Sequence, residues 1–569
     1  MSTLSTPLQH LNGEALNDEQ QRYLEGFFAG LAARGVRFAD VEPAPAVAGK
    51  ASTDDLIFEE RVKRELHPLD AFGQILDNAT ANKPPDKEET FRFKWNGLFF
   101  LTPNKEAFMA RLRIPGGALK AFQLRELAAI ARELTTGYVQ ITTRANLQMR
   151  LIEAKDTPAF LRRVQAVGLH TRGAGADNIR NLTANPTAGV DPRELIDVMP
   201  LCQELAQTIL NDRSFYDLPR KFNIAYDGGG LIGTVEDTND IGARAVKVGE
   251  EVLFRIAVGG ATGHKAFARD LGILVKPSEL NRVVAALVRV YIAHGNRGDR
   301  KRARLKHLLE SWPLERYLAE AEKLLGATLR RAGAGEPGER PPDVPHSHIG
   351  VHPQRQPGLN YIGVAMPVGQ ITPKQMVRVA EIAELYGSGE IRLTVWQNLI
   401  LPNVPDAYVE TVTRALRKIG FDTRQSMLRG GLVACTGNAY CKFAQTGTKG
   451  HALALADYLE RRVPLDLPVN IHLTGCPNSC AQHYMGDIGL LGVKVKGVEC
   501  YHVFVGGGFG SRQAVGRQVF SGISFEDLKP TLEKMLKAYL RHREPSQSFQ
   551  AFTLRHDLNT LQAYFSNNE

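Results

Sequence analysis

Residues 115–147 read PGGALKAFQLRELAAIARELTTGYVQITTRANL, and this stretch decides the fold because the chain carries it twice. Residues 367–399, which begin 252 positions later, read PVGQITPKQMVRVAEIAELYGSGEIRLTVWQNL. Extended to residue 172, the two copies share 14 identities in 58 positions without a gap. Chance would give roughly one identity in fifteen positions. The repeat therefore predicts two copies of one structural unit.

Local patterns give this repeated unit, called A in the first half and A′ in the second, an α+β shape. Residues 109–117 (MARLRIPGG) predict a strand that ends in a turn, and residues 119–134 place apolar side chains at helical spacing. Residues 137–152 are rich in β-formers, and residues 158–167 predict a second helix. This order predicts a sheet with helices on one face.

A second repeat, called B and B′, has an offset of 247 residues and includes the pairs Asn223 with Asn470 and Asp240 with Asp487. The chain order is therefore A-B-A′-B′, preceded by an extension with a predicted helix at 18–34. Pro-rich linkers are expected at 41–49 and 332–347. The expected boundaries are 1–90 for the N-terminal helical extension and linker, 91–172 for A, 173–335 for B, 346–424 for A′ and 425–569 for B′.

The composition limits the classes of protein to which the chain can belong. At roughly 150 residues per domain, 569 residues suggest about four domains. The chain is 43% hydrophobic and 23% charged, as in ordinary globular proteins. Its apolar runs are shorter than the ~20 residues that span a bilayer, and its polar N-terminus predicts a cytoplasmic protein that does not bind membranes. The formal charge, 70 minus 61 or +9, favours an acidic partner or an anionic substrate.

Four of the six cysteines cluster in the second half, within local sequences ACTGNAYCK and TGCPNSCAQ. Two thiol pairs on separate loops predict one metal centre, and the spacing favours a [4Fe–4S] cluster over structural zinc, whose pairs are usually closer in sequence. Cys202 and Cys500 are expected to be buried apolar side chains. The expected ligands are Cys435, Cys441, Cys476 and Cys480.

The first half instead carries arginines where the second half has other residues. At the aligned positions A′ and B′ have Gly363, Ala365, Trp396, Pro402 and Leu432. A set of arginines on β-rich segments and adjoining loops predicts an anion-binding cavity, because the guanidinium fork suits carboxylates and oxyanions. The five arginines are Arg111, Arg113, Arg144, Arg150 and Arg180.

With these motifs in place, the chain resembles the sirohaem- and [4Fe–4S]-containing nitrite and sulfite reductases, and among them the assimilatory ferredoxin-type nitrite reductases. The resemblance covers about residues 90–550 and rests on CTGNAYC, TGCPNSC, DNIRN and LPRKFN occurring in order. It implies an α+β fold in which two ferredoxin-like half-domains (A and A′) pair, and two α/β domains (B and B′) bind sirohaem, substrate and cluster. It also implies a cytoplasmic monomer that reduces nitrite to ammonium with six electrons.

The resemblance assigns roles to single residues. Cys435, Cys441, Cys476 and Cys480 resemble the cluster ligands, and Cys480 resembles the thiolate shared with the sirohaem iron. Arg111, Arg180, Lys221 and Asn223 resemble the residues that bind the anion on the distal face. The positions that resemble holders of the sirohaem carboxylates are Arg144, Gln148, Arg150, Arg220 and Gln397.

Two positions bear on the choice between nitrite and sulfite. Where sulfite reductases typically have a second lysine this chain has Asn223, and where they often have an arginine after the bridging cysteine it has Gln482. A less positive pocket favours the nitrite monoanion over sulfite, which is partly a dianion. Nitrite is therefore the expected substrate and sulfite, reduced to sulfide with the same cofactors, the alternative. The expected donor is ferredoxin or a similar small acidic electron carrier.

Three other classes of protein share some of these sequence features. The basic run 296–307 (NRGDRKRARLKH) is what a nucleic-acid-binding protein would show, but such runs are usually solvated surfaces, so no nucleic-acid partner is expected. A zinc-stabilised binding module would contain zinc without iron. A sirohaem-lacking monooxygenase of corrin biosynthesis resembles this family too, but the full set of distal cations argues against it.

Overall fold

The computed structural model describes residues 56–566, except for 102–105, 136, 425 and most of 334–347, together with the short paired strands β1 (His10–Leu11) and β2 (Glu14–Ala15). The chain divides into two compact units, Met1–Leu56 and Ile57–Glu569. All four repeated segments lie in the second unit. The predicted helix at 18–34 and the linker at 41–49 lie outside the described residues.

The first ferredoxin-like half-domain follows the predicted order. Strand β4 (Phe108–Arg111) precedes helix α5 (Ala121–Leu134), which presents Leu124, Leu127 and Ile130 to the core. Two strands and helix α6 (Thr157–Ala166) follow. The remaining strands are β3 (Leu98–Phe100), β5 (Ala118–Lys120), β6 (Val139–Ile141) and β7 (Leu147–Ile152).

The second half-domain repeats this order. Helix α11 (Pro373–Tyr386) is the counterpart of α5 and begins at a capping box in which the Thr372 side chain accepts from the backbone of Gln375. Helix α12 (Val409–Lys418) is the counterpart of α6. Its strands are β12 (Gly350–Pro353), β13 (Leu359–Val364), β14 (Gln370–Ile371), β15 (Glu390–Leu393) and β16 (Leu399–Pro405).

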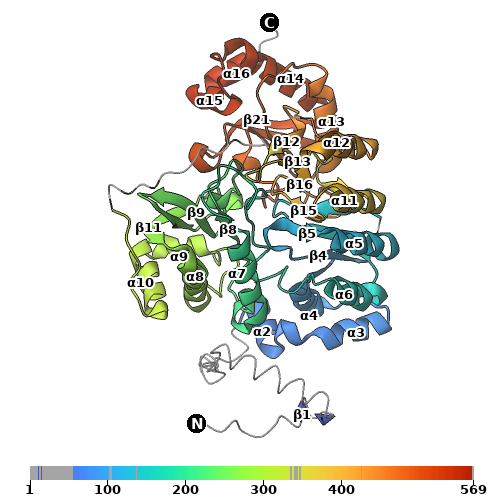
Figure 1. The fold of residues 1–569 in the computed structure, drawn as a ribbon, viewed down its shortest axis with the longest axis vertical. Helices are drawn as coiled ribbons and strands as arrows, with labels where there is room; N and C mark the ends of the chain where they lie inside the picture. Colours follow the sequence, from blue (N-terminus) through green and yellow to red (C-terminus); the bar gives the residue numbers. More distant parts are fainter. Residues whose placement is uncertain are drawn as a thin grey trace. The chain divides into compact units, whose positions relative to one another are not determined.

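The two half-domains exchange one short strand each. The sheets have the orders β14-β6-β7-β4-β3 and β12-β13-β16-β15-β5. Strand β14 of the second half pairs with β6 through Ile371 and Val139, and β5 of the first half pairs with β15 through Leu119 and Ile391. Helices α5 and α11 lie side by side, next to the strands of the two sheets (Figure 1).

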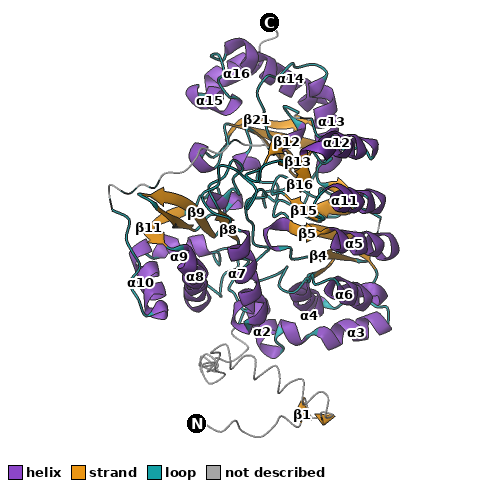
Figure 2. Ribbon diagram, in the orientation of Figure 1, coloured by secondary structure: helices purple, strands orange, loops and turns teal. Residues whose placement is uncertain are grey.

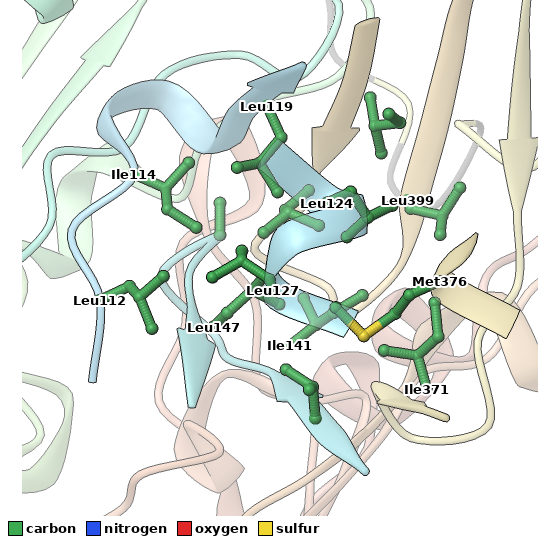
Figure 3. Packing of buried hydrophobic residues seen from close by; sticks show 14 of the residues in the cluster. Leu112, Ile114, Leu119, Leu124, Leu127, Ile141, Leu147, Ile371, Met376 and Leu399 are labelled. Atoms are coloured by element: carbon green, nitrogen blue, oxygen red, sulfur yellow. The ribbon is translucent and has the colours of Figure 1, made fainter. Parts of the chain in front are cut away.

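One hydrophobic core joins the two half-domains. Figure 3 shows Leu124 and Leu127 of α5 in the same cluster as Ile371 and Met376 of the second half. These side chains are at most 3% exposed. Burying one such side chain is worth roughly 1.5–3 kcal/mol, so the shared core is a major source of stability. The predicted pairing of two ferredoxin-like half-domains is confirmed.

Domain B is built on a four-stranded sheet of order β11-β10-β9-β8. Its strands are β8 (Ile224–Asp227), β9 (Ile241–Val248), β10 (Glu251–Val258) and β11 (Arg269–Val275), and its helices are α7 (Met199–Asn211), α8 (Leu280–His294), α9 (Leu305–Ser311) and α10 (Leu314–Leu325). Strands β8 and β9 are parallel, and helices pack beside the sheet (Figure 2).

Domain B′ repeats this sheet in the same register: Ile471 pairs with Ile488 as Ile224 pairs with Ile241, 247 residues earlier. The sheet order is β17-β18-β19-β20-β21. Its strands are β17 (Leu432–Ala434), β18 (Ile471–Thr474), β19 (Ile488–Val495), β20 (Val498–Val505) and β21 (Arg517–Ser524), and its helices are α13 (Thr448–Glu460), α14 (Phe525–His542), α15 (Phe549–Arg555) and α16 (Leu558–Ser566).

Before the first half-domain lie three helices that the sequence patterns did not predict: α2 (Phe58–Glu65), α3 (Phe72–Thr80) and α4 (Lys87–Arg92). Trp95, which follows α4, is fully buried, and its indole N–H donates to the carbonyl of Tyr216 at 2.8 Å. These helices are therefore anchored on domain B. Among the described residues, the helices all fall short of the length and apolarity that crossing a bilayer requires.

Candidate functional site

The four cysteines follow the ends of two neighbouring parallel strands. Cys435 comes directly after β17, and Cys476 and Cys480 come shortly after β18. Because β17 and β18 are parallel, their carboxyl ends lie at the same edge of the sheet, where α/β domains usually bind ligands. The Cys435 N–H donates to Leu473 O of β18 at 3.0 Å, so the pairing of the two strands reaches Cys435.

The thiols share one electrostatic neighbourhood. Cys480 interacts with each of the other three thiols, and desolvation by the protein packed around it raises the pKa of the Cys480 thiol to about 11, although the side chain keeps exposed surface. Burial also raises the pKa of Cys476. Among the described residues there is no group of three or more His, Cys, Asp or Glu placed to hold a single metal ion. A four-iron cluster asks for a different arrangement, because each thiolate binds its own iron atom.

Cys480 differs from its neighbours in the loop in how exposed it is. Ser479 and Ala481 on either side are buried, whereas Cys480 is exposed. The loop is strained, because Ser479 has φ +52°. Thr143 of the first half-domain donates its hydroxyl to Cys480 O at 3.1 Å, so the two halves of the chain meet at this residue.

The cations of the first half gather around this thiol. Arg111, Arg144 and Lys221 all interact electrostatically with Cys480. Arg111 ends β4, where it lies opposite Gln148 of β7. Two of the predicted distal residues, Arg111 and Lys221, and one predicted cofactor-binding residue, Arg144, thus lie near the thiol of Cys480. Their roles toward anion and cofactor stay predictions.

Arg180 and Lys221 come from two segments that pair with one another. Arg180 N–H donates to Phe222 O at 2.8 Å, and Phe222 N–H donates to Asn178 O at 3.0 Å. Asn223, two residues beyond Lys221, is 6% exposed, and its backbone N–H donates to Asp240 at 2.9 Å. Residues two apart on an extended segment share a face, so Lys221 and Asn223 face the same way.

Burial and mutual repulsion lower the pKa values of these cations, because too little negative charge lies around them. Burial, with a contribution from Arg304, lowers the pKa of the Lys221 ammonium to about 7. Burial lowers the pKa of Arg144 and of Arg150 to about 10, and that of Arg180 well below its ordinary value. A bound group that carries carboxylates or a small anion would supply the missing charge.

Some hydrogen-bond donors of Arg150 and Arg180 have no partner. Arg150 is 4% exposed; its Nη2 donates to Gln148 at 2.7 Å and to Thr436 at 2.8 Å, while its Nε and Nη1 have no partner. Nη1 of Arg180 is likewise buried without a partner. Buried guanidinium donors are rarely left unpaired, so these atoms fit a carboxylate-bearing group.

Three other predicted cofactor-binding residues already have partners. Arg144 donates to the Asn239 side chain at 2.8 Å, and Arg220 lies 3.7 Å from Asp177. Gln397 has φ +61°, and its amide accepts from Ala434 N–H at 2.9 Å and donates to Ala434 O and Ile141 O. Gln397 therefore holds the residue that precedes Cys435, and its predicted role toward sirohaem carboxylates stays a prediction.

Arginines of the basic run 296–307 form ion pairs that stabilise the fold. Arg300 forms a bidentate pair with Asp177, with N–O distances of 2.5 and 2.8 Å, and Arg297 lies 3.0 Å from Glu60 of α2. Asp177, the first residue of the DNIRN motif, is fully buried and also lies 3.9 Å from Lys63 of α2. Sequence patterns missed this network because its partners are far apart in the chain: Asp177 is 123 residues from Arg300 and 114 residues from Lys63. The one clue in the sequence is an acidic residue close to Arg180, which was predicted to bind an anion.

We expect Asp177→Asn to lower the free energy of unfolding by about 3–5 kcal/mol, because it removes the fully buried carboxylate to which Arg300 donates two hydrogen bonds. Urea unfolding followed by Trp fluorescence and circular dichroism measures the change. Asp70→Asn is the matched control, because Asp70 pairs with Arg213 at an exposed site and its loss should cost at most about 1 kcal/mol. Equal effects of the two substitutions would contradict the prediction.

The repeated aspartates explain part of the second repeat. Asp487 accepts from the backbone and the side-chain amide of Asn470, at 2.9 and 2.7 Å. Asp240 accepts from the backbone of Asn223, but its second partner is Arg304, at 2.8 Å. Arg304 thus takes the place that the Asn470 amide takes in the other half. Arg304 therefore places one more cation near Lys221.

The fold and the site together define the class of the protein: a duplicated α+β protein in which one half supplies a group of thiols and the other supplies cations around them. Models of two domain families match the chain. The nitrite and sulphite reductase 4Fe-4S domain matches residues 175–329 and 429–554, and the nitrite/sulfite reductase ferredoxin-like half domain matches residues 102–167 and 352–419. The chain belongs to the nitrite and sulphite reductase family.

Individual relatives agree with this assignment. The ferredoxin–nitrite reductase of Synechococcus elongatus is 38% identical over 502 residues, which cover 85% of this chain and 97% of its own length. The chloroplastic ferredoxin–nitrite reductase of Zea mays is 35% identical over 504 residues, covering 84% and 88%. The solved structure of the Mycobacterium tuberculosis NirA protein is 30% identical, covers 89% of this chain and 97% of its own, and superposes with a TM-score of 0.82.

Proposed function

We propose that this chain is a ferredoxin-dependent nitrite reductase that converts nitrite to ammonium with six electrons in nitrite assimilation. The observation that carries the proposal is the 38% identity to a ferredoxin–nitrite reductase along 97% of that protein. The cofactors are a sirohaem and a [4Fe–4S] cluster, in keeping with the family model. Because one chain holds both halves of the fold, the proposed working form is a monomer, which analytical ultracentrifugation tests.

The proposal includes a role for each group of side chains. Cys435, Cys441, Cys476 and Cys480 would bind the cluster, and Cys480 would be shared with the sirohaem iron. Its exposed thiol amid buried neighbours supports that role. Arg150, with two unpartnered donors, fits a sirohaem carboxylate. The other residues proposed to hold carboxylates are Arg144, Gln148, Arg220 and Gln397.

When bound, the cofactor pair supplies the electrons and the iron at which the anion is reduced. The chain's own residues do the rest. Arg111, Arg180 and Lys221 attract nitrite and stabilise negative charge that develops on it, a contribution that grows in a cavity of low dielectric. The Lys221 ammonium, with a pKa lowered to about 7, can release a proton near neutral pH as oxygen leaves.

Anaerobic spectroscopy with turnover measurements tests the function. Purified protein should show coupled sirohaem and iron–sulfur signals that respond to nitrite, and with a reduced dye it should produce ammonium faster than it produces sulfide from sulfite. Zinc without iron would contradict the proposal outright. A faster sulfite reaction would instead assign the chain to the sulfite-reducing branch of the family.

We expect Asn223→Lys to raise the ratio of kcat/KM for sulfite to that for nitrite by about tenfold, because a second buried cation near Lys221 favours the more highly charged anion. Steady-state rates with both anions and a dye donor measure the ratio. Asn223→Met is the matched control, since it adds length without charge. An unchanged ratio in Asn223→Lys protein that keeps the cofactor spectrum would count against this role of Asn223.

We expect salt to inhibit activity with ferredoxin while activity with a small neutral dye is retained. The chain carries a net charge of +9, and docking of an acidic carrier weakens as the Debye length falls from about 10 Å at 0.1 M to about 3 Å at 1 M salt. Initial rates with both donors across this range provide the measurement. Parallel loss with both donors would mean that salt acts on the enzyme rather than on docking.

A further inference from the structure

Lys449, the second residue of helix α13, is a buried lysine without an acidic partner. It is 7% exposed, and its ammonium donates to Val368 O at 2.5 Å and to Ala434 O at 3.2 Å. Within the part of the chain that the structure describes, Lys449 forms no ion pair with a carboxylate. Fully buried lysines are rare unless they are paired, so a cation at this position calls for a negative group nearby.

The charged groups that act on the Lys449 amine are Arg150 and Cys435. Burial lowers the pKa of Lys449 to about 7, Arg150 adds to this effect, and Cys435 opposes it. The group that favours the charged amine is therefore a thiol proposed to bind the cluster. A thiol that binds a metal is a thiolate. When the cluster is present, the net electrostatic effect of Arg150 and Cys435 on the Lys449 amine therefore changes.

The first turn of α13 is fastened to Cys435 itself. The Thr448 hydroxyl donates to Cys435 O at 2.7 Å and lies 3.6 Å from the Cys435 sulfur. The same sulfur accepts from Gly475 N–H at 3.2 Å. Lys449 bonds the carbonyl of Ala434, which Gln397 also contacts. Among these groups that contact residues 434 and 435, Lys449 is the one that carries a positive charge.

We propose that Lys449 is the buried counter-charge of the iron–sulfur cluster and raises its reduction potential; the proposal rests on the cluster ligation put forward under the proposed function. A cluster held by four thiolates is anionic, and one electron from the reduced carrier adds a further negative charge. No bond forms or breaks in that step. A cation held in a medium of low dielectric stabilises the reduced form more than the oxidised form.

The bond to Val368 O could also serve only to hold the fold, and substitutions separate the two roles. Lys449→Gln keeps an N–H donor and removes the charge, and Lys449→Met removes both. Lys449→Arg keeps the charge. Lys442→Gln is the matched control, because Lys442 follows the cluster ligand Cys441 but is exposed, where solvent screens its charge.

The measurement is a redox titration of the holoenzyme cluster, followed by EPR. At a fixed ambient potential, Lys449→Gln and Lys449→Met should have about a tenfold lower ratio of reduced to oxidised cluster, which corresponds to about 59 mV for a one-electron couple. Lys442→Gln should change the ratio by less than about twofold. Lys449→Arg should titrate like the wild type.

A wild-type titration curve for Lys449→Gln would overturn the inference while leaving the proposed function intact. A wild-type protein without any cluster signal would contradict both. If the Gln and Met variants fail to assemble a cluster, Lys449→Arg decides. An Arg variant with a cluster of wild-type potential supports the role of the charge, and an Arg variant without a cluster shows that the shape of the lysine is what matters and overturns it.

Discussion

Cys480→Ser protein is expected to lose nitrite reduction by more than about 100-fold and to lose the coupled sirohaem and iron–sulfur spectrum. Removing an outer partner of a metal ligand typically costs 10–100-fold, and here the proposed ligand itself is removed. The structure singles out this thiol because it is exposed within a buried loop and interacts with Arg111, Arg144 and Lys221. Iron content, the anaerobic optical and EPR spectra and ammonium production measure the effect.

Cys500→Ala is the matched control for this substitution. Cys500 lies in β20, is 3% exposed and belongs to neither cysteine loop. The sequence predicted a buried, apolar side chain here, and Cys500 is buried. Its replacement should therefore leave iron content and spectra unchanged. A Cys480→Ser protein with a full complement of iron and normal turnover would refute the proposed shared ligand.

Arg180→Gln is expected to lower kcat/KM for nitrite by about 100- to 1000-fold, the range seen when one preorganised donor is removed from a site that stabilises developing charge. Arg180 is anchored through its backbone to Phe222, and its Nη1 is buried without a partner. Glutamine keeps part of the hydrogen bonding but removes the charge. Steady-state kinetics with a dye donor measure the change.

The cofactor spectrum distinguishes this effect from a loss of cofactor, since Arg180→Gln protein should keep it. Arg302→Gln provides the control, because it removes one positive charge from a side chain that is 66% exposed. Its kinetics should match the wild type. Similar losses in the two variants would mean that net charge, rather than the Arg180 contact, governs nitrite turnover.

Much of the fold was predictable because the repeat is long and its helices are strongly periodic. The predicted helix at 119–134 is α5, and the predicted strands around Arg111 and Gln148 are β4 and β7. The exchange of β5 and β14 was not predictable, because strands of two or three residues carry no periodicity. Helices α2–α4 were also missed, since they have no copy in the second half.

Residue type and spacing predicted that the four cysteines lie together, as they do in the structure. Their role as cluster ligands stays a prediction. The contacts of single side chains were less predictable, because the folded structure decides which partner each side chain meets. Gln397 bonds the backbone of Ala434, although its place in the repeat suggested a cofactor contact. Lys449 gave no signal at all, because a lysine in a polar helix start is ordinarily solvated and only the packing of α13 on β17 buries it.

The exchanged strands also set the order of events when the chain is made. Lys120 pairs with Glu390, so the first half-domain must wait for 270 further residues, 390 minus 120, before its strand β5 has a partner. At 5–20 residues per second, that delay is on the order of tens of seconds on the ribosome. During it, the edge at β6 and the apolar side of α5 stay uncovered, a state prone to aggregation. The nascent chain thus exposes apolar surface until its second half emerges, and the cysteine loops are made only after both exchanged strands have left the ribosome.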